Sequence, residues 1–163
     1  MSSWFAGRLP DNWFVKAPTV TVDKEEIVVI GELPPLEGEF SDDAAQAAAE
    51  AGRIARFRED TRHERMEIAR HAEHQFGRKV SWGVEIGNTQ ELYTHQSVPV
   101  MTRLKQPERM VLDTLVDAGV AKSRSEALGW AVRLVGQHTT EWLDELREAM
   151  TKVDELRARG PAK

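Results

Sequence analysis

The clearest pattern of apolar and polar positions in this chain lies between residues 98 and 135. Its first eight residues alternate, which is typical of a strand with two different faces. One face is mainly aliphatic and the other carries basic groups: Val98, Val100, Thr102 and Leu104 against Pro99, Met101, Arg103 and Lys105. Pro107 suits the first turn of a helix. The apolar positions that follow recur at helical spacing as far as Gly119, a residue typical of helix ends.

A second helix is predicted from the residues around Ser123. Ser123 and Glu126 have the spacing of a capping box, in which the serine accepts from the first turn and the glutamate reaches back. The pattern therefore predicts a strand, a helix of about three turns, a tight turn and a longer helix.

This order of elements resembles the ribbon-helix-helix family of DNA-binding proteins, of the Arc, MetJ and CopG type. The resemblance covers residues 98–136 only. The matching motifs are Arg103-Leu104 at the end of the strand, Leu112-Asp113, Gly119-Val120, the run from Ser123 to Leu128, and Ala131-Val132-Arg133.

The resemblance implies a homodimer that reads double-stranded DNA with a two-stranded ribbon in the major groove. One strand and two short helices bury too little apolar area alone, so two copies would share one core. The implied base-reading residues are Met101, Arg103 and Lys105, and the implied phosphate-binding residues are Ser123, Arg124 and Ser125. The implied dimer core is Val98, Val100, Leu104, Leu112, Leu115, Leu128 and Val132.

Residues 1–97 predict a small α+β domain, for which the sequence suggests no family. A β-hairpin is expected over residues 17–33, one long helix from Ser41 to Phe76, and a further strand or hairpin over residues 79–93. We expect the helix to lie on one face of an antiparallel sheet. The aromatic residues near the start of the chain are expected to pack onto that sheet or onto a protein partner: Trp4, Phe5, Trp13 and Phe14.

The predicted long helix carries an excess of basic residues. Residues 53–79 hold eight Lys and Arg against five Asp and Glu. We favour a solvated helix with ion pairs between neighbouring turns, and a second nucleic-acid face is the alternative. Glu67, His71 and His74 share a helical face at a spacing that can bind metal, but exposed helices often carry such sets, and we expect no metal site.

Residues 137–163 predict a helical extension with an apolar seam. The seam residues Trp142, Leu146, Val153 and Leu156 belong to a stripe that repeats with alternating steps of four and three, as in a coiled coil. Gly136 and the pair Thr139-Thr140 weaken the middle, so a break over residues 136–140 is possible. We expect the seam to mediate self-association, either within the dimer or between dimers as a higher oligomer. The alternatives are that the N-terminal domain or another protein covers it.

Composition narrows the class of protein further. The chain has no cysteine, no apolar run long enough to span a membrane and no recognisable leader, which predicts a cytoplasmic protein. No phosphate-binding glycine loop or nucleophile motif is present, so we expect neither an enzyme nor a cofactor. The net charge is −5, but residues 98–135 alone carry six basic and four acidic residues.

Two functions remain open from the sequence. The first is a dimeric, sequence-specific DNA-binding protein, which would act as a transcriptional regulator or an antitoxin-type autorepressor. The second is an oligomeric interaction module, antitoxin-like or a scaffold, in which this unit only dimerises. Arg103 and Lys105 favour DNA, whereas Pro99 and Met101 favour a protein contact.

Overall fold

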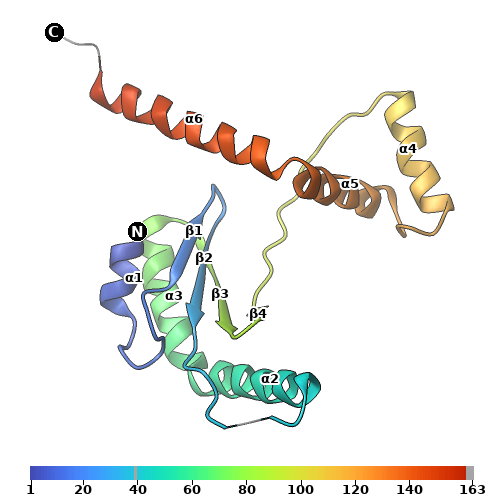
Figure 1. The fold of residues 1–163 in the computed structure, drawn as a ribbon. Helices are drawn as coiled ribbons and strands as arrows, with labels where there is room; N and C mark the ends of the chain where they lie inside the picture. Colours follow the sequence, from blue (N-terminus) through green and yellow to red (C-terminus); the bar gives the residue numbers. More distant parts are fainter. Residues whose placement is uncertain (39, 161–163) are drawn as a thin grey trace. The chain divides into compact units, whose positions relative to one another are not determined.

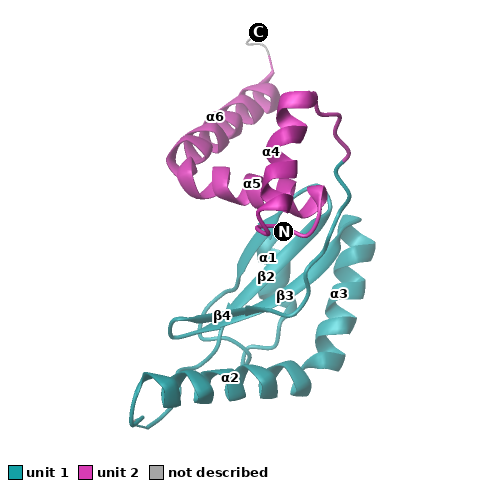
Figure 2. Cartoon of the chain, turned by 90° about the vertical axis from the view of Figure 1, so that its right-hand side faces the viewer, with its two compact units in different colours: residues 1–100 teal, residues 101–163 magenta. Residues whose placement is uncertain are grey.

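The chain folds into two compact units, residues 1–100 and residues 101–163 (Figure 2). The structure is a computed structural model, and it describes residues 1–38 and 40–160. The first unit holds a four-stranded sheet with helices, and the second is helical. The predicted α+β class is confirmed. The two segments predicted as separate, residues 98–136 and 137–163, lie largely together in the second unit, and residues 161–163 lie outside the described part.

A mixed sheet forms the centre of the first unit. Its strands are β1 (Thr19–Val22), β2 (Glu26–Glu32), β3 (Lys79–Ile86) and β4 (Thr89–Leu92), in that spatial order. Both predicted hairpins are confirmed as antiparallel pairs. The expected fully antiparallel sheet is wrong, because β2 and β3 run parallel. A parallel pair needs a long crossover connection, and the helical segment between these two strands supplies it.

Three helices pack against the sheet: α1 (Ser2–Arg8), α2 (Asp43–Asp60) and α3 (Arg62–Phe76) (Figure 1). The N-terminal aromatic residues pack as predicted, with Phe5 and Trp13 buried in the core. Edge-to-face contacts join Trp13 to Phe57 of α2 and to Trp82 of β3. Such aromatic pairs add to the stabilisation that burial alone provides.

The predicted single helix over residues 41–76 is wrong, because Thr61 divides it into α2 and α3. The backbone of Thr61 leaves the helical region, and its hydroxyl donates to the carbonyl of Phe57 at 2.6 Å. β-Branched residues that bond back to the preceding turn bend helices in this way. The N-cap of α2 is Asp42, whose side chain accepts from the N–H of Ala45, and not Ser41. The predicted end at Phe76 is confirmed for α3, and Gly77 follows it in the left-handed conformation.

The second unit contains α4 (Gln106–Asp117), α5 (Arg124–His138) and α6 (Thr140–Arg159). The break between α5 and α6 falls at Thr139, inside the window that the sequence predicted. Thr139 again donates to the preceding turn, at the carbonyl of Val135. The predicted strand over residues 98–105 does not form in this chain. A strand needs a hydrogen-bonded neighbour, and no other segment of the described chain pairs with these residues.

Gly31→Ala should destabilise the first unit. A Cβ at this position of β2 would lie 2.2 Å from the ring of Phe14, so the ring must move. Overpacking of this kind costs about 1–3 kcal/mol. Gly52→Ala is the matched control, because Gly52 is exposed on α2 and a Cβ there would meet open space. This variant should gain up to about 1 kcal/mol of stability, since alanine favours the helix more than glycine does. Denaturant unfolding of both variants checks this, and a shift in the same direction would contradict it.

Candidate functional site

The helices α4 and α5 form a hairpin around a very small core. Leu112, Ala121 and Ala127 are the buried residues of this cluster. Leu104, Leu115 and several neighbours pack against them while remaining half-exposed. Gly119 ends α4 with a φ of 74°, and the N–H of Val120 then bonds back to the carbonyl of Leu115. This closing turn fixes the start of the loop that leads into α5.

The N-terminus of α5 has both arms of the capping interaction that the sequence predicts. The Ser123 hydroxyl accepts from the N–H of Glu126 at 3.2 Å. The Glu126 carboxylate accepts from the N–H of Lys122 at 2.8 Å, one residue before the cap. The N–H groups of Arg124 and Ser125 lie in the first turn, where a helix provides no internal acceptor. This end of α5 therefore presents free donors and a positive dipole end to solvent.

Arg124 is already engaged within the unit. Its Nε and Nη2 donate to the two carboxylate oxygens of Asp113 on α4, at 2.6 and 2.8 Å. The hydrogen bond from Arg124 lowers the pKa of Asp113, and the hydrogen bond to Asp113 raises the pKa of Arg124. The pair is exposed, so its contribution to stability is small. Its geometry nevertheless joins α4 to α5.

The other predicted contact residues lie on the surface. Met101 is 96% exposed, and Arg103 and Lys105 are exposed beside it in the segment that leads into α4. Ser123 and Ser125 are exposed at the start of α5. These five residues thus lie on the segments just before α4 and at the beginning of α5.

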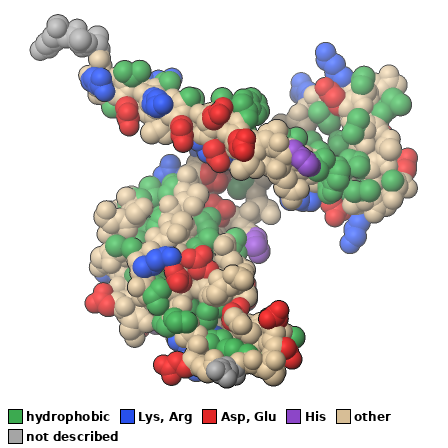
Figure 3. Space-filling model, in the orientation of Figure 1, with side chains coloured by type: hydrophobic (Ala, Val, Ile, Leu, Met, Phe, Trp, Pro, Cys, Tyr) green, Lys and Arg blue, Asp and Glu red, His purple; other side chains and the backbone are tan. Residues whose placement is uncertain are grey.

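Most of the predicted dimer core is uncovered in the single chain. Leu112 is buried, whereas Leu104, Leu115 and Leu128 are half-buried. The exposed fractions of the remaining members are large: Val98 51%, Val100 86% and Val132 65%. Figure 3 shows apolar side chains gathered over this unit, with lysine and arginine at their margins. Exposed apolar patches of this kind are typical of interaction sites.

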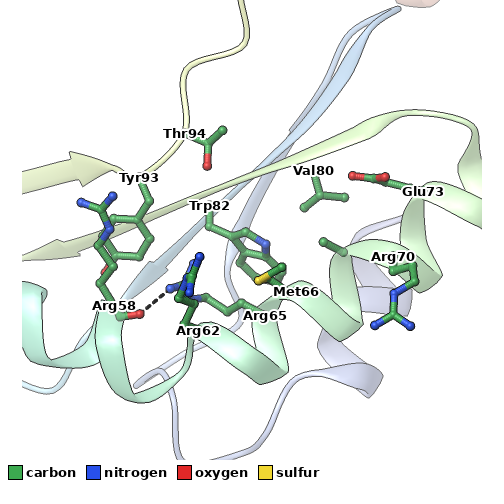
Figure 4. Close-up of a pocket in the computed structure, with 11 residues that line it drawn as sticks. Arg58, Arg62, Arg65, Met66, Arg70, Glu73, Val80, Trp82, Tyr93 and Thr94 are labelled. Carbon is green, nitrogen blue, oxygen red and sulfur yellow. Dashed lines mark hydrogen bonds between the residues drawn. The ribbon is translucent and has the colours of Figure 1, made fainter.

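The first unit contains a cleft that the sequence reasoning did not identify. It has a volume of about 440 Å³ and lies between α3, the strand β3 and the segment after β4 (Figure 4). Its lining is rich in arginine and has two aromatic residues: Arg58, Arg62, Arg65, Arg70, Trp82 and Tyr93. Glu73 is the acidic residue of the lining, and it pairs with Lys79.

Arg65 organises one wall of this cleft. Its side chain is 6% exposed, and it donates to the hydroxyl of Thr61 at 2.9 Å and to the carbonyl of Arg58 at 2.6 Å. Its guanidinium lies 4.8 Å from the centre of the Tyr93 ring, a cation–π contact. Burial lowers the pKa of Arg65. Among the described residues no carboxylate pairs with it, so the charge is held by neutral acceptors and an aromatic face.

The arrangement suits an anionic group. Guanidinium groups bind carboxylates and phosphates through paired donors, and Trp82 and Tyr93 add flat apolar surface. The indole N–H of Trp82 is buried, and the described atoms include no acceptor for it. The sequence did contain one signal of an arginine-rich cleft, which is the excess of basic residues over residues 53–79. Arg58 and Arg65 lie on either side of the kink at Thr61, and the guanidinium groups of both approach the ring of Tyr93.

No triad of His, Asp or Glu side chains converges on a metal position in residues 1–38 and 40–160. His71, one of the residues considered for such a site, instead lies 3.0 Å from a guanidinium nitrogen of Arg8. None of the described helices is both long enough and apolar enough to cross a membrane.

The chain is thus an α+β protein with an arginine-lined cleft in one unit and a helical hairpin, preceded by Arg103 and Lys105, in the other. Residues 1–92 match the N-terminal domain of Rv1265-like proteins, and residues 105–157 match the Mb1296 C-terminal domain. The chain belongs to the Rv1265-like family. No solved structure matches it.

Two similar relatives are Mb1296 of Mycobacterium bovis and Rv1265 of Mycobacterium tuberculosis strain H37Rv. Each is 64% identical over 160 residues, which cover 98% of this chain and 70% of the relative. Both are named as uncharacterized proteins. The similarity extends over both units of the chain.

The assignment to the ribbon-helix-helix family is wrong. The family matched over residues 105–157 is the Mb1296 C-terminal domain, which spans α4, α5 and α6 and omits the proposed ribbon. Two sequence features explain the difference. Thr102 occupies a position that is usually a branched aliphatic, and Pro107 lies later than the usual junction, so the strand and its entry to the helix depart from that pattern.

Tyr93 should ionise at unusually high pH. Burial raises its pKa from 10.0 to about 12. Because the raised pKa favours the protonated phenol in the folded state, this stabilisation is complete below pH 10 and is lost as pH rises toward 12. Tyr93 is the sequence's only tyrosine, so phenolate absorbance reports on it directly. A native titration that coincides with that of the urea-unfolded chain would show that the ring is not buried.

Proposed function

We propose that this protein is a homodimeric, sequence-specific DNA-binding protein that acts in transcriptional regulation. The observation that carries the proposal is the combination of basic residues and free helix donors on a unit whose apolar surface is uncovered. Arg103 and Lys105 precede α4, and Lys122 precedes α5. A cytoplasmic location, as expected from the sequence, belongs to this proposal.

The need for a second copy follows from the size of the core. Residues 101–163 form one unit, and the buried core found there consists of Leu112, Ala121 and Ala127. A core of one leucine and two alanines provides little hydrophobic stabilisation for a unit of this length. Val111 and Val132 are among its exposed apolar residues. A second copy that covers these positions would supply the missing apolar area.

DNA is favoured as the ligand by the charge and donor types. Residues 98–135 carry six basic and four acidic residues, and a dimer doubles the excess. Arginine can bind guanine through two hydrogen bonds, which discriminates base pairs by about 1–3 kcal/mol. The first turn of α5 offers N–H groups and the Ser125 hydroxyl to a phosphate. Arg124 would contribute to the phosphate contact only by sharing or exchanging its bond with Asp113.

A protein-interaction module is the second candidate. The specific observation that favours it is the exposure of Met101, which is 96% exposed next to Pro99. Exposed methionine and proline are common at protein contacts, whereas they offer no hydrogen bond to a base edge. In that case the helical unit would still dimerise, and Arg103 would be dispensable.

Arg103→Ala should abolish specific DNA binding without lowering stability. The side chain is exposed, and within the described residues it takes part in no ion pair, so its removal leaves the fold intact. The matched control is Arg147→Ala on α6, which is also exposed and lies outside the proposed interface. Gel-shift titrations against genomic fragments at two salt concentrations would measure both variants. Parent-like binding by Arg103→Ala would favour the interaction module.

Val132→Asp should prevent dimer formation. Val132 is 65% exposed in the single chain, so a charge there is solvated in a monomer but would be buried and unpaired in a dimer. Val15→Asp is the control, since Val15 is 49% exposed in the first unit. Sedimentation at low micromolar concentration should show a dimer for the parent and the control but not for Val132→Asp. A dimer that persists in Val132→Asp and also in the double variant Val132→Asp/Leu146→Asp, which removes the apolar seam of α6 as well, would place the shared core elsewhere.

A further inference from the structure

The helix α6 has an apolar seam that nothing in its own unit covers. None of the residues in α6 (Thr140–Arg159) is buried. The exposed fractions along the seam are high: Trp142 58%, Leu146 44%, Val153 38% and Leu156 59%, and Met150 on its flank is 54% exposed. A helix of this length extends for about 30 Å, which is long enough for several layers of coiled-coil packing.

We propose that α6 pairs antiparallel with α6 of a second copy. This interface is separate from the one that residues 98–135 are proposed to form, and it does not depend on DNA binding. Two properties of the seam favour α6 of a second copy as the partner and an antiparallel orientation. They are the sizes of the facing side chains and the charges beside them.

The side-chain sizes match in the antiparallel register. In that register Trp142 faces Val153 of the second copy, and Leu146 faces Ala149, so each large residue meets a smaller one. These contacts occur twice by symmetry and give four layers. A parallel pair would instead place Trp142 against Trp142 and Ala149 against Ala149. It would therefore be overfilled at one layer and underfilled at another, and both defects are destabilising.

The charges select the same direction. In an antiparallel pair the flanking positions bring Glu145 next to Lys152 of the second copy, twice by symmetry. Along α6 the ion pairs of the described chain join Asp144 to Arg147 and Asp154 to Arg157. Neither Glu145 nor Lys152 takes part in these ion pairs. The opposite flank then brings Leu143 next to Met150, which covers the exposed methionine.

A parallel pair has no such complementarity. It would place Lys152 next to Arg157 of the second copy, again twice, and it would place Glu145 beside the apolar Met150. Flanking charges set the partner and the orientation of paired helices. The seam is therefore complementary to itself only when the two helices run antiparallel. Such self-complementarity is expected of a two-fold symmetric contact between identical copies.

Disulfide cross-linking tests the direction in the full chain, which has no native cysteine. The double variant E145C/K152C should form a covalent dimer under mild oxidation. Within one helix these positions are seven residues, or about 10 Å, apart, too far for a bond in the same chain. The single variants E145C and K152C are the matched controls and should stay monomeric in denaturing gels. Cross-linking by A149C alone would indicate a parallel pair and would overturn the proposal.

Charge reversal provides an independent measurement. K152E should weaken the α6 association about tenfold, because it turns two attractions into two repulsions. E145K/K152E should restore it. A parallel pair predicts the opposite for K152E, since it would remove the repulsion from Arg157. Sedimentation equilibrium gives the association constants, and stronger association of K152E would overturn the proposed direction.

A core variant separates this interface from the proposed function. L146D should abolish the α6 association and leave cooperative unfolding and single-site DNA binding unchanged. Loss of folding in L146D would show that the seam belongs to the core of the unit and would overturn the proposal. If the parent protein does not bind DNA but E145C/K152C still forms the cross-linked dimer, the proposed function is wrong and the proposed α6 pairing is supported.

Discussion

The second unit is constrained by an apolar surface that its own small core leaves uncovered. Leu112, Ala121 and Ala127 are the buried residues of its hairpin, while Val111 and Val132 are exposed. The first unit has no such deficit, because its sheet, three helices and aromatic residues enclose two connected clusters. Hydrophobic burial stabilises a domain roughly in proportion to the area removed from water. The two units therefore differ in kind, one complete as a single chain and the other suited to association.

The first unit depends on a different local feature, the break at Thr61. Arg58 and Arg65, on either side of it, both lie over the ring of Tyr93, at 5.3 and 4.8 Å from its centre. A guanidinium that is buried without a carboxylate is costly. Hydrogen bonds from Arg65 to Thr61 and to the Arg58 carbonyl offset that cost and hold the cleft open to an anion.

Local signals in the sequence were predicted well, and long-range pairing was not. The hairpins, the left-handed Gly77, the cap at Ser123 and the break near Thr139 each depend on a few neighbouring residues. The parallel pairing of β2 with β3 depends on how a long connection folds back, which alternation along one strand does not encode. The arginine cleft depends in turn on that sheet and on Thr61. The family resemblance rested mainly on motifs of the two helices, whereas the strand that it also required does not form over residues 98–105 and lies, except for its last residue, outside the matched C-terminal domain.

Association through two separate surfaces has a consequence for how such a protein would occupy DNA. If residues 98–135 form the dimer and α6 joins a further copy, binding at one site raises the local concentration of protein at a neighbouring one. The seam offers four small layers and two exposed ion pairs, so each α6 contact is weak by itself. A weak contact adds little in solution, but it becomes effective when DNA holds two dimers at the right spacing. The size of the α6 interface is therefore suited to cooperative binding rather than to a permanent assembly.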